Sequence, residues 1–218
     1  MFRGHSNSSY RLLSTLTRDH SIDTNLEIKN YDKLIQIDDI AKCETHRLPI
    51  ISKELFYLSI GRHLGYPCRM IDWTADLDTA LHFLLEKDND KEGELWCLAI
   101  PSNRIENDIN PFNISDSLLH IIKEDFLIPH GEGILDSPLG ILRMIVQNGF
   151  FTVINTKLST TPINELAETS LNGVKCVNIK LSPQARLNLL TYFHKKQIQQ
   201  LYISTSNPII ELVKKIYK

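Results

Sequence analysis

The sequence predicts a single α+β domain built around a mixed central sheet. Helical and strand patterns alternate along the chain, which favours helices packed on a sheet. One buried helix face is predicted by apolar residues at helical spacing, namely Leu77, Ala80, Leu81 and Leu84. Residues 94–100 are apolar on both faces, as in a central strand. The chain has 218 residues, 42% of them hydrophobic, which suffices for one buried core.

Cap and turn signals place the elements of the first half of the chain. Residues 2–4 predict a strand that enters a turn. Because the chain begins almost at this strand, either the strand is short or further sequence precedes it. Ser52 as N-cap and Gly65 as C-cap predict a helix over residues 52–64. Residues 67–74 predict a strand.

The next helix begins at Thr74 or Asp76. Two segments are less regular. Residues 10–18 fit either a helical turn or an extended segment, and residues 19–48 are polar with little periodicity.

The second half of the chain predicts an insertion or lid, followed by further strands and helices. Residues 102–136 form the expected lid because they hold two prolines and two glycines but no clear periodicity. After the lid we expect a helix over 136–147, a strand over 150–156, a strand over 174–181, a helix from Ser182-Pro183, a strand over 200–204 and a helix from Pro208.

The charge is distributed unevenly along the chain. Residues 175–218 hold eight Lys or Arg and one Glu, a charge of +7, whereas the net charge of the whole chain is −2. This basic C-terminal part, expected as strand, helix, strand and helix, suits an acidic partner such as nucleic acid. A solvated basic helix face is the alternative.

Four scattered cysteines and a polar start without an apolar leader favour a cytoplasmic protein. Because the cysteines form no C-x-x-C pair, they predict no metal site. No apolar run approaches the length of a membrane span, so none is predicted.

Several polar residues occur in settings that would hold a ligand. Arg3 and Arg69 are flanked by apolar or turn residues, and a fixed guanidinium clamps phosphate or carboxylate well. Gly4 would allow a ligand close to the backbone. Tyr10 or Trp73 could stack on a flat ring.

Four further candidates lie near strand and helix ends. Asp72 and Thr74 lie at the end of a short strand, where they could face one cleft. Arg143 and Gln147 lie one helical turn apart on one face. His63 lies near a helix end.

Each of these residues also has a structural interpretation. Arg3 could pair with Asp72, and Arg69 could pair with the same carboxylate. Trp73 could belong to the core, and His63 could cap helix carbonyls. Arg143 and Gln147 could satisfy buried backbone groups. Both interpretations stay open at the level of sequence.

An ordered set of motifs resembles the FRG domain family along nearly the whole chain. The motifs are Phe2-Arg3-Gly4, Tyr10-x-Leu12, Thr15-Leu16-x-Arg18, the stretch from His63 to Thr74, Ala80-Leu81-x-Phe83, and Arg143-Met144-x-x-Gln147-x-Gly149-x-Phe151. The sequence departs from the family pattern at three positions. Arg62 replaces Gln, Leu64 replaces an aromatic residue, and Cys68 replaces Thr. A thiol beside Arg69 could have a lowered pKa.

The first-strand arginine of this family is similar to that of ADP-ribosyltransferases. The resemblance implies a split sheet, NAD as substrate and transfer of ADP-ribose to a macromolecule. Taken with the residue-level interpretation, it makes Arg3, Asp72 and Gln147 the candidate catalytic residues, and Gln147 stands where a glutamate is often found in the transferases. The residues that would bind NAD are Arg3, Gly4, Tyr10, His63, Arg69, Trp73, Thr74 and Arg143.

Three classes of function follow. The first is an ADP-ribosyltransferase-like toxin of a bacterial toxin–antitoxin or phage-defence system, with an antitoxin protein as partner and nucleic acid or protein as acceptor. The second is a nucleotide- or nucleic-acid-binding module without catalysis, favoured by the amide of Gln147 in place of a carboxylate. The third is an interaction protein whose motifs only maintain the fold.

Overall fold

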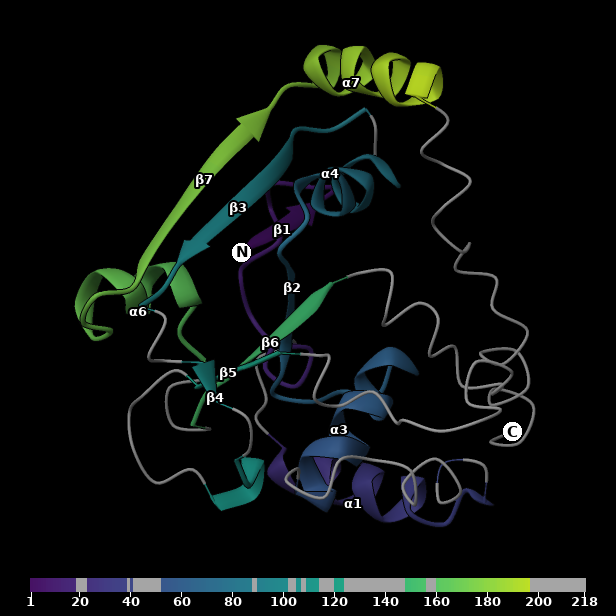
Figure 1. The fold of residues 1–218 in the computed structure, drawn as a ribbon, viewed down its shortest axis with the longest axis vertical. Helices are drawn as coiled ribbons and strands as arrows, with labels where there is room; N and C mark the ends of the chain where they lie inside the picture. Colours follow the sequence, from purple (N-terminus) through teal and green to yellow (C-terminus); the bar gives the residue numbers. More distant parts are fainter. Residues whose placement is uncertain are drawn as a thin grey trace.

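The computed structural model describes residues 1–18, 23–38, 40, 52–87, 90–101, 105–106, 109–113, 120–123, 148–155 and 160–196 (Figure 1). The elements in chain order are β1 (Phe2–His5), α1 (Thr24–Leu34), α3 (Lys53–His63), β2 (Ile71–Thr74), α4 (Leu77–Leu85), β3 (Gly93–Ala99), β4 (Ile105–Glu106), the 3₁₀ helix η2 (Pro111–Asn113), β5 (His120–Lys123), β6 (Gly149–Val153), α6 (Ile163–Thr169), β7 (Lys175–Leu181) and α7 (Pro183–Lys196).

The described strands form one seven-stranded sheet in the order β4-β5-β6-β2-β1-β3-β7. The β4–β5 pair is parallel, and the other neighbouring pairs are antiparallel. Helices pack on this sheet (Figure 1). The predicted α+β class with a central sheet is therefore confirmed.

The pairing between neighbouring strands is shortest between β1 and β2. These two strands share one register pair, Phe2 with Thr74, whereas β1 shares four pairs with β3 and β2 shares four with β6. The β4-β5-β6-β2 and β1-β3-β7 parts are thus joined through a single residue pair. The finer expectation of an ADP-ribosyltransferase-like split sheet stays a prediction.

The helix boundaries around the site follow from local caps. The Ser52 hydroxyl accepts a hydrogen bond from the Leu55 amide at 3.2 Å. Helix α3 ends at His63, with Leu64 as its C-cap and Gly65, which has a φ of +87°, directly after it. The Asp76 carboxylate accepts from the Thr79 amide at 3.0 Å and so fixes the start of α4. The sequence predicted both helices correctly.

Helices α1 and α6 are elements that the sequence analysis did not predict, and α1 shows why. It occupies residues predicted to be irregular, and its N-cap is Asp23. Leu26 and Ile28 are 37% and 45% exposed, whereas the carboxylic acid residue Glu27 is fully buried. Apolar residues on the outer face and a charge on the inner face conceal the usual helical pattern.

The edges of other predicted elements also shift. Strand β2 begins at Ile71, not at residue 67. Ala80 and Leu84 of α4 are buried as predicted, but Leu77 is 42% exposed because it lies in the first turn.

Within the expected lid, the described residues include strands β4 and β5, of which β5 pairs with β6. These strands extend the sheet instead of covering it. The helix predicted over 136–147, and the strand and helix predicted after residue 200, lie outside the described residues.

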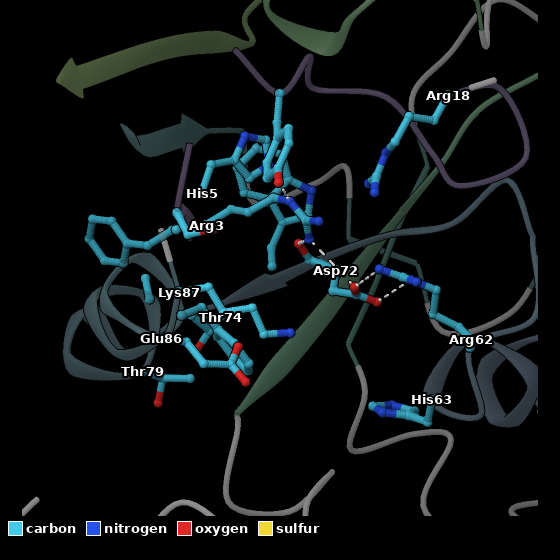
Figure 2. Close-up of a pocket in the computed structure, with 18 residues that line it drawn as sticks. Arg3, His5, Arg18, Arg62, His63, Asp72, Thr74, Thr79, Glu86 and Lys87 are labelled. Carbon is cyan, nitrogen blue, oxygen red and sulfur yellow. Dashed lines mark hydrogen bonds and ion pairs between the residues drawn. The ribbon is translucent and has the colours of Figure 1, made fainter. Parts of the chain in front are cut away.

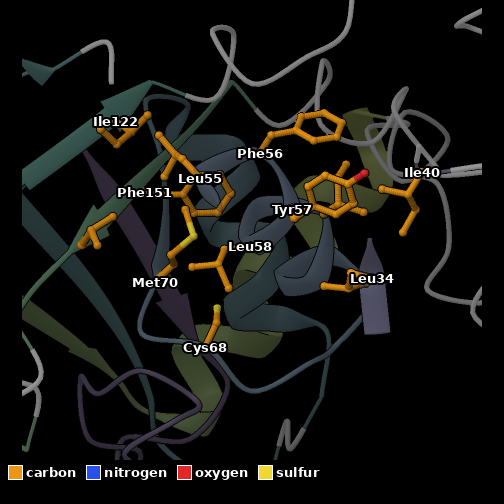
Figure 3. Packing of buried hydrophobic residues seen from close by; sticks show 12 residues of the cluster. Leu34, Ile40, Leu55, Phe56, Tyr57, Leu58, Cys68, Met70, Ile122 and Phe151 are labelled. Carbon is orange, nitrogen blue, oxygen red and sulfur yellow. The ribbon is translucent and has the colours of Figure 1, made fainter. Parts of the chain in front are cut away.

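Buried side chains pack in three clusters around the sheet. Side chains from α1, α3 and the β5–β6 side of the sheet form the first cluster, which includes Phe56, Tyr57, Met70, Ile122 and Phe151 (Figure 3). The second cluster includes Trp73 and Trp96 and is closed by residues of α6, and the third lies between α4 and the β1–β3 pair. Burial of each large apolar side chain stabilises the fold by about 1.5–3 kcal/mol.

Helix α7 is tied to the rest of the domain by one buried cation. Arg186 has no exposed surface, and its guanidinium donates to four backbone carbonyls. Nη1 donates to Ser6 at 2.7 Å and Lys91 at 2.8 Å, and Nη2 donates to Leu84 at 2.6 Å and Lys87 at 2.5 Å. Residues that are far apart in sequence are thereby held together at the end of α4.

No helix in the described part of the chain combines the length and apolar character needed to cross a membrane.

Candidate functional site

A cavity of about 500 Å³ lies where β1 and β2 part. Its described lining comes from β1 and the loop after it, the end of α3, β2 and α4. Seven residues singled out from the sequence line it: Arg3, Gly4, Tyr10, His63, Asp72, Trp73 and Thr74. The short β1–β2 pairing therefore creates the space in which most of the candidates meet.

Arg3 bridges the two strands at this opening. Its Nη1 donates to the backbone oxygen of Asp72 at 2.6 Å and lies 3.4 Å from the Asp72 Oδ2, while its Nε donates to His5 Nε2 at 3.0 Å. Burial lowers the pKa of Arg3 to about 10, although the charge of Asp72 opposes this shift. Arg3 is still a cation at neutral pH.

Asp72 is held between two guanidinium groups. Arg62 Nε donates to Oδ1 at 2.9 Å, and Arg62 Nη2 donates to Oδ2 in a very short contact, so the pair is bidentate. Burial alone would raise the pKa of Asp72, but the charges of Arg62, Arg3 and His63 outweigh it and lower the pKa to about 2. The Arg3–Asp72 ion pair, one of the two interpretations left open by the sequence, is present, and Arg62 is the second cation that pairs with Asp72.

His5 lies beside Arg3 as a neutral ring. Only 6% of the residue is exposed, and burial, followed by the charges of Arg3 and Arg18, lowers its pKa to about 3. Its Nε2 accepts the Arg3 hydrogen bond, which requires that nitrogen to be unprotonated. His5 thus orients the Arg3 guanidinium without adding charge.

Gly4 has a packing role in addition to the ligand approach expected of it, which stays a prediction. A Cβ built on Gly4 would lie 2.0 Å from the Ala80 carbonyl oxygen and 2.6 Å from the Leu84 nitrogen, both in the backbone of α4. The missing side chain therefore lets α4 pack directly against β1. The close approach at this glycine is that of a helix, although Gly4 also contributes to the cavity wall.

Arg69 does not line the cavity, contrary to its expected role in NAD binding. Its guanidinium is paired with Glu27 of α1, at 2.6 Å from Nη2 to Oε2, and Nη1 donates to the Pro111 oxygen at 2.6 Å. The side chains are 6% and 0% exposed. Arg69 therefore fastens α1 and η2 to the start of β2, and its partner is Glu27, not Asp72.

The neighbouring Cys68 is not an activated thiol. It is buried, and burial raises its pKa to about 12 despite the nearby Arg62. The expected lowering of this pKa is wrong because desolvation of a thiolate outweighs the nearby positive charge.

The aromatic candidates divide between the core and the cavity. Trp73 is 3% exposed, packs in the second core cluster and donates from Nε1 to Thr152 Oγ1 at 3.0 Å. Tyr10 is 45% exposed, and its ring lies edge-on to His5 at 6.2 Å between centroids. Of the two, Tyr10 has the exposed ring that stacking on a ligand requires.

Thr74 and His63 also lie on the cavity wall. The Thr74 hydroxyl accepts from the Asp76 amide at 3.0 Å, which links the end of β2 to the start of α4. His63 packs edge-on against Phe151 with 5.9 Å between ring centroids. Arg143 and Gln147 lie outside the described residues, so their expected roles stay predictions.

Four charged residues of the lining were not singled out as site residues from the sequence: Arg18, Arg62, Glu86 and Lys87. The sequence could have marked Arg62 as a site residue, because it stands where the FRG pattern has Gln. It could also have marked Arg18, which belongs to one of the quoted motifs. Glu86 and Lys87 follow α4 as ordinary polar residues, and nothing in the sequence marked them as site residues. Figure 2 shows Glu86 and Lys87 on one side of the Arg3–Asp72 bridge and Arg62 and His63 on the other.

The charged groups make this cavity suitable for an anion. Arg3, Arg18, Arg62 and Lys87 face two carboxylates, Asp72 and Glu86, among the described residues of the lining. Guanidinium groups fixed by packing are good donors to phosphate oxygens. No group of three or more His, Cys, Asp or Glu within the described residues is arranged to hold a metal ion.

The comparisons with known proteins agree with the first part of the motif set. Residues 1–93 match the FRG domain. Neither a curated protein nor a solved structure matches the chain. The match ends before Arg143 and Gln147, but it includes every described residue that lines the cavity, from Phe2 to Lys87. The chain therefore contains an FRG domain over residues 1–93, and the candidate site lies within that domain.

Proposed function

We propose that the cavity binds NAD and that the protein transfers ADP-ribose from NAD to a macromolecular acceptor. The observation that carries this proposal is the group of guanidinium side chains at the opening between β1 and β2. Arg3 and Arg62 share one carboxylate, and Arg18 adds a further positive charge to the same wall. A diphosphate, which carries two negative charges, would be attracted to this wall.

The size and the lining of the cavity also support a nucleotide ligand. About 500 Å³ lies within the range of pockets that hold small molecules and cofactors. The exposed Tyr10 ring offers a stacking surface for a base or a nicotinamide. The resemblance of the first-strand arginine to that of ADP-ribosyltransferases selects NAD among nucleotides.

The residues suggest a division of roles in the reaction. Cleavage of the nicotinamide–ribose bond develops positive charge on the ribose, as in other glycosidic cleavages. Asp72 stays ionised because its pKa is about 2, so its negative charge offsets part of the positive charge of Arg3 and Arg62 that would otherwise oppose positive charge on the ribose. Arg3 and Arg62 hold this carboxylate in place and present their remaining N–H groups to the ligand.

The acceptor and the biological setting extend this proposal. Nucleic acid fits the basic residues 175–218, although the described part contributes less surface charge than the sequence suggests. Arg186 is buried, and Lys180 lies 3.5 Å from Glu92. A toxin role in bacterial defence, cytoplasmic, with an antitoxin as partner, rests on the resemblance alone.

A binding module without catalysis is the second candidate. Asp72 favours it, because both of its oxygens are held by Arg62 and a carboxylate with a pKa of about 2 is a poor proton acceptor. In this alternative the same cations would recognise a nucleotide or nucleic acid that is not turned over.

The decisive experiment combines binding with turnover. The purified chain would be titrated with NAD by calorimetry. It would also be incubated with labelled NAD and separate RNA, DNA and protein acceptors, while nicotinamide release is measured. We expect binding, nicotinamide release and label transfer to one acceptor class. Binding without release would favour the second candidate, and a folded protein that neither binds NAD nor releases nicotinamide would overturn the proposal.

Two variants connect the result to the cavity. Arg18→Ala removes an exposed side chain of the lining, so it should weaken NAD binding about 10-fold with little change in folding. Arg11→Ala is the matched control, since Arg11 is 51% exposed and pairs with Glu165 outside the cavity. Equal affinities of the two variants for NAD would place the ligand elsewhere.

A further inference from the structure

Two carboxylates line the cavity among the described residues, and they differ in what they can do. Asp72 is bound through both oxygens to Arg62, and Arg3 approaches it as well. A carboxylate engaged in this way contributes charge but cannot readily accept a proton from a substrate. Glu86 is the other carboxylate of the lining, and its residue is exposed.

Glu86 lies across the Arg3–Asp72 bridge from Arg62 and His63 (Figure 2). A ligand that contacts the guanidinium groups and fills the cavity would also reach the α4 side, where Glu86 lies. Thr74 and Thr79 lie on the same side and make that wall polar. The two carboxylates would thus face different parts of one ligand.

The backbone around Glu86 is fixed even though its side chain is exposed. Glu86 is the C-cap of α4, between Leu84 and Lys87 in the chain. The carbonyl oxygens of both residues accept hydrogen bonds from Nη2 of Arg186, at 2.6 and 2.5 Å. A helix end that is tied on both sides of Leu85 and Glu86 holds the Cα of Glu86 in a defined position.

From this arrangement we propose that Glu86 is the general base of the site, a role that rests on the proposed function. In the transfer step the bond between the ribose C1′ and the nicotinamide nitrogen breaks, and nicotinamide leaves with the bonding electrons. An acceptor hydroxyl, or water, forms the new bond to C1′. Its proton passes to the Glu86 carboxylate and then to solvent, so NAD and acceptor give ADP-ribosylated acceptor, nicotinamide and one proton.

The test compares three carboxylate variants of the full chain. Glu86→Gln keeps the size of the side chain but removes the proton acceptor, and Glu86→Asp keeps the acceptor but withdraws it by one methylene. Glu92→Gln is the matched control, because Glu92 is 44% exposed, pairs with Lys180 and does not line the cavity. NAD affinity and the rate of nicotinamide release at saturating NAD are measured for each variant.

We expect Glu86→Gln to lower turnover 100-fold or more, on the order of the contribution of a general base, while NAD affinity changes less than about threefold. Glu86→Asp should retain part of the activity, and Glu92→Gln all of it. Sodium azide provides a second readout, because an azide ion attacks C1′ without losing a proton. Azide should therefore restore nicotinamide release in Glu86→Gln.

The outcomes separate this inference from the proposed function. If the wild-type chain turns NAD over and Glu86→Gln does so at a similar rate, Glu86 is not the base and the proposed function stands. Loss of turnover that azide does not restore, together with weakened NAD binding, would also overturn the role as base. If the folded wild-type chain neither binds NAD nor releases nicotinamide, the proposed function fails, and the role of Glu86 fails with it.

Discussion

Arg3 and Asp72 meet across the sheet although their side chains start from opposite faces of it. Phe2 pairs with Thr74, and side chains alternate along each strand, so Arg3 lies on the face opposite to Asp72. In a fully paired sheet these side chains would be kept apart. Here Arg3 Nη1 lies 2.6 Å from the Asp72 backbone oxygen because β1 and β2 separate after one residue pair.

The neutral state of His5 predicts how stability depends on pH. Its pKa falls from 6.5 to about 3 on folding, so the unfolded chain binds the proton more readily. This contribution is complete above pH 6.5 and is lost as the pH falls toward 3. The loss of unfolding free energy from this contribution, between about pH 6.5 and about pH 5, should be about 2 kcal/mol.

The variant His5→Gln keeps a hydrogen-bond acceptor for Arg3 but does not titrate. Urea unfolding at both pH values should show a smaller acid loss in this variant than in the wild-type chain. Asp72 titrates at lower pH, with a folded pKa of about 2, so it does not interfere in this range. An unchanged pH dependence in His5→Gln would contradict the prediction.

The buried Arg69–Glu27 pair should affect stability but not ligand binding. Glu27→Gln leaves Arg69 buried without a counter-charge, which should lower the unfolding free energy by about 3–5 kcal/mol. The double variant Glu27→Leu with Arg69→Met should recover much of this loss. Chemical denaturation measures the stability, and NAD titration of the double variant measures binding. A large loss of NAD affinity in the folded double variant would contradict the prediction and indicate that Arg69 contributes to NAD binding.

Gly4 and Gly65 predict two different costs for the same substitution. In Gly4→Ala the new methyl group would collide with the backbone of α4, so α4 must move and the protein should lose about 3 kcal/mol or more. In Gly65→Ala the methyl group meets open space, and only the positive φ of +87° is unfavourable, at about 1 kcal/mol. Thermal unfolding of both variants gives the comparison. A larger loss in Gly65→Ala would contradict the direct packing of α4 on β1.

Arg186 should couple α7 to the cavity. In Arg186→Lys one ammonium group cannot reach all four carbonyls that the guanidinium holds, so the unfolding free energy should fall by about 3 kcal/mol or more. Two of these carbonyls belong to Ser6 and Lys87, which line the cavity, so NAD affinity should fall as well. Arg11→Lys serves as the surface control. Unchanged stability and NAD affinity in Arg186→Lys would show that the four hydrogen bonds of the Arg186 guanidinium are dispensable.

The sequence alone was sufficient for the parts of this protein that depend on neighbouring residues. Ser52, Gly65 and Asp76 mark helix ends because caps act within a few residues, and the spacing of Ala80 and Leu84 identified the buried face of α4. The motif set also identified the FRG domain, now matched over residues 1–93. Seven of the predicted site residues line one cavity.

The tertiary structure decided which charges meet. Arg69 and Asp72 are close in the chain, yet Arg69 pairs with Glu27, 42 residues away, and Asp72 pairs with Arg62 and Arg3. Glu86 and Arg186 carry no sequence signal, since one follows a helix end and the other resembles a surface residue. Ion pairs and burial depend on the distances between segments that folding brings together, and a pattern of neighbouring residues does not contain those distances.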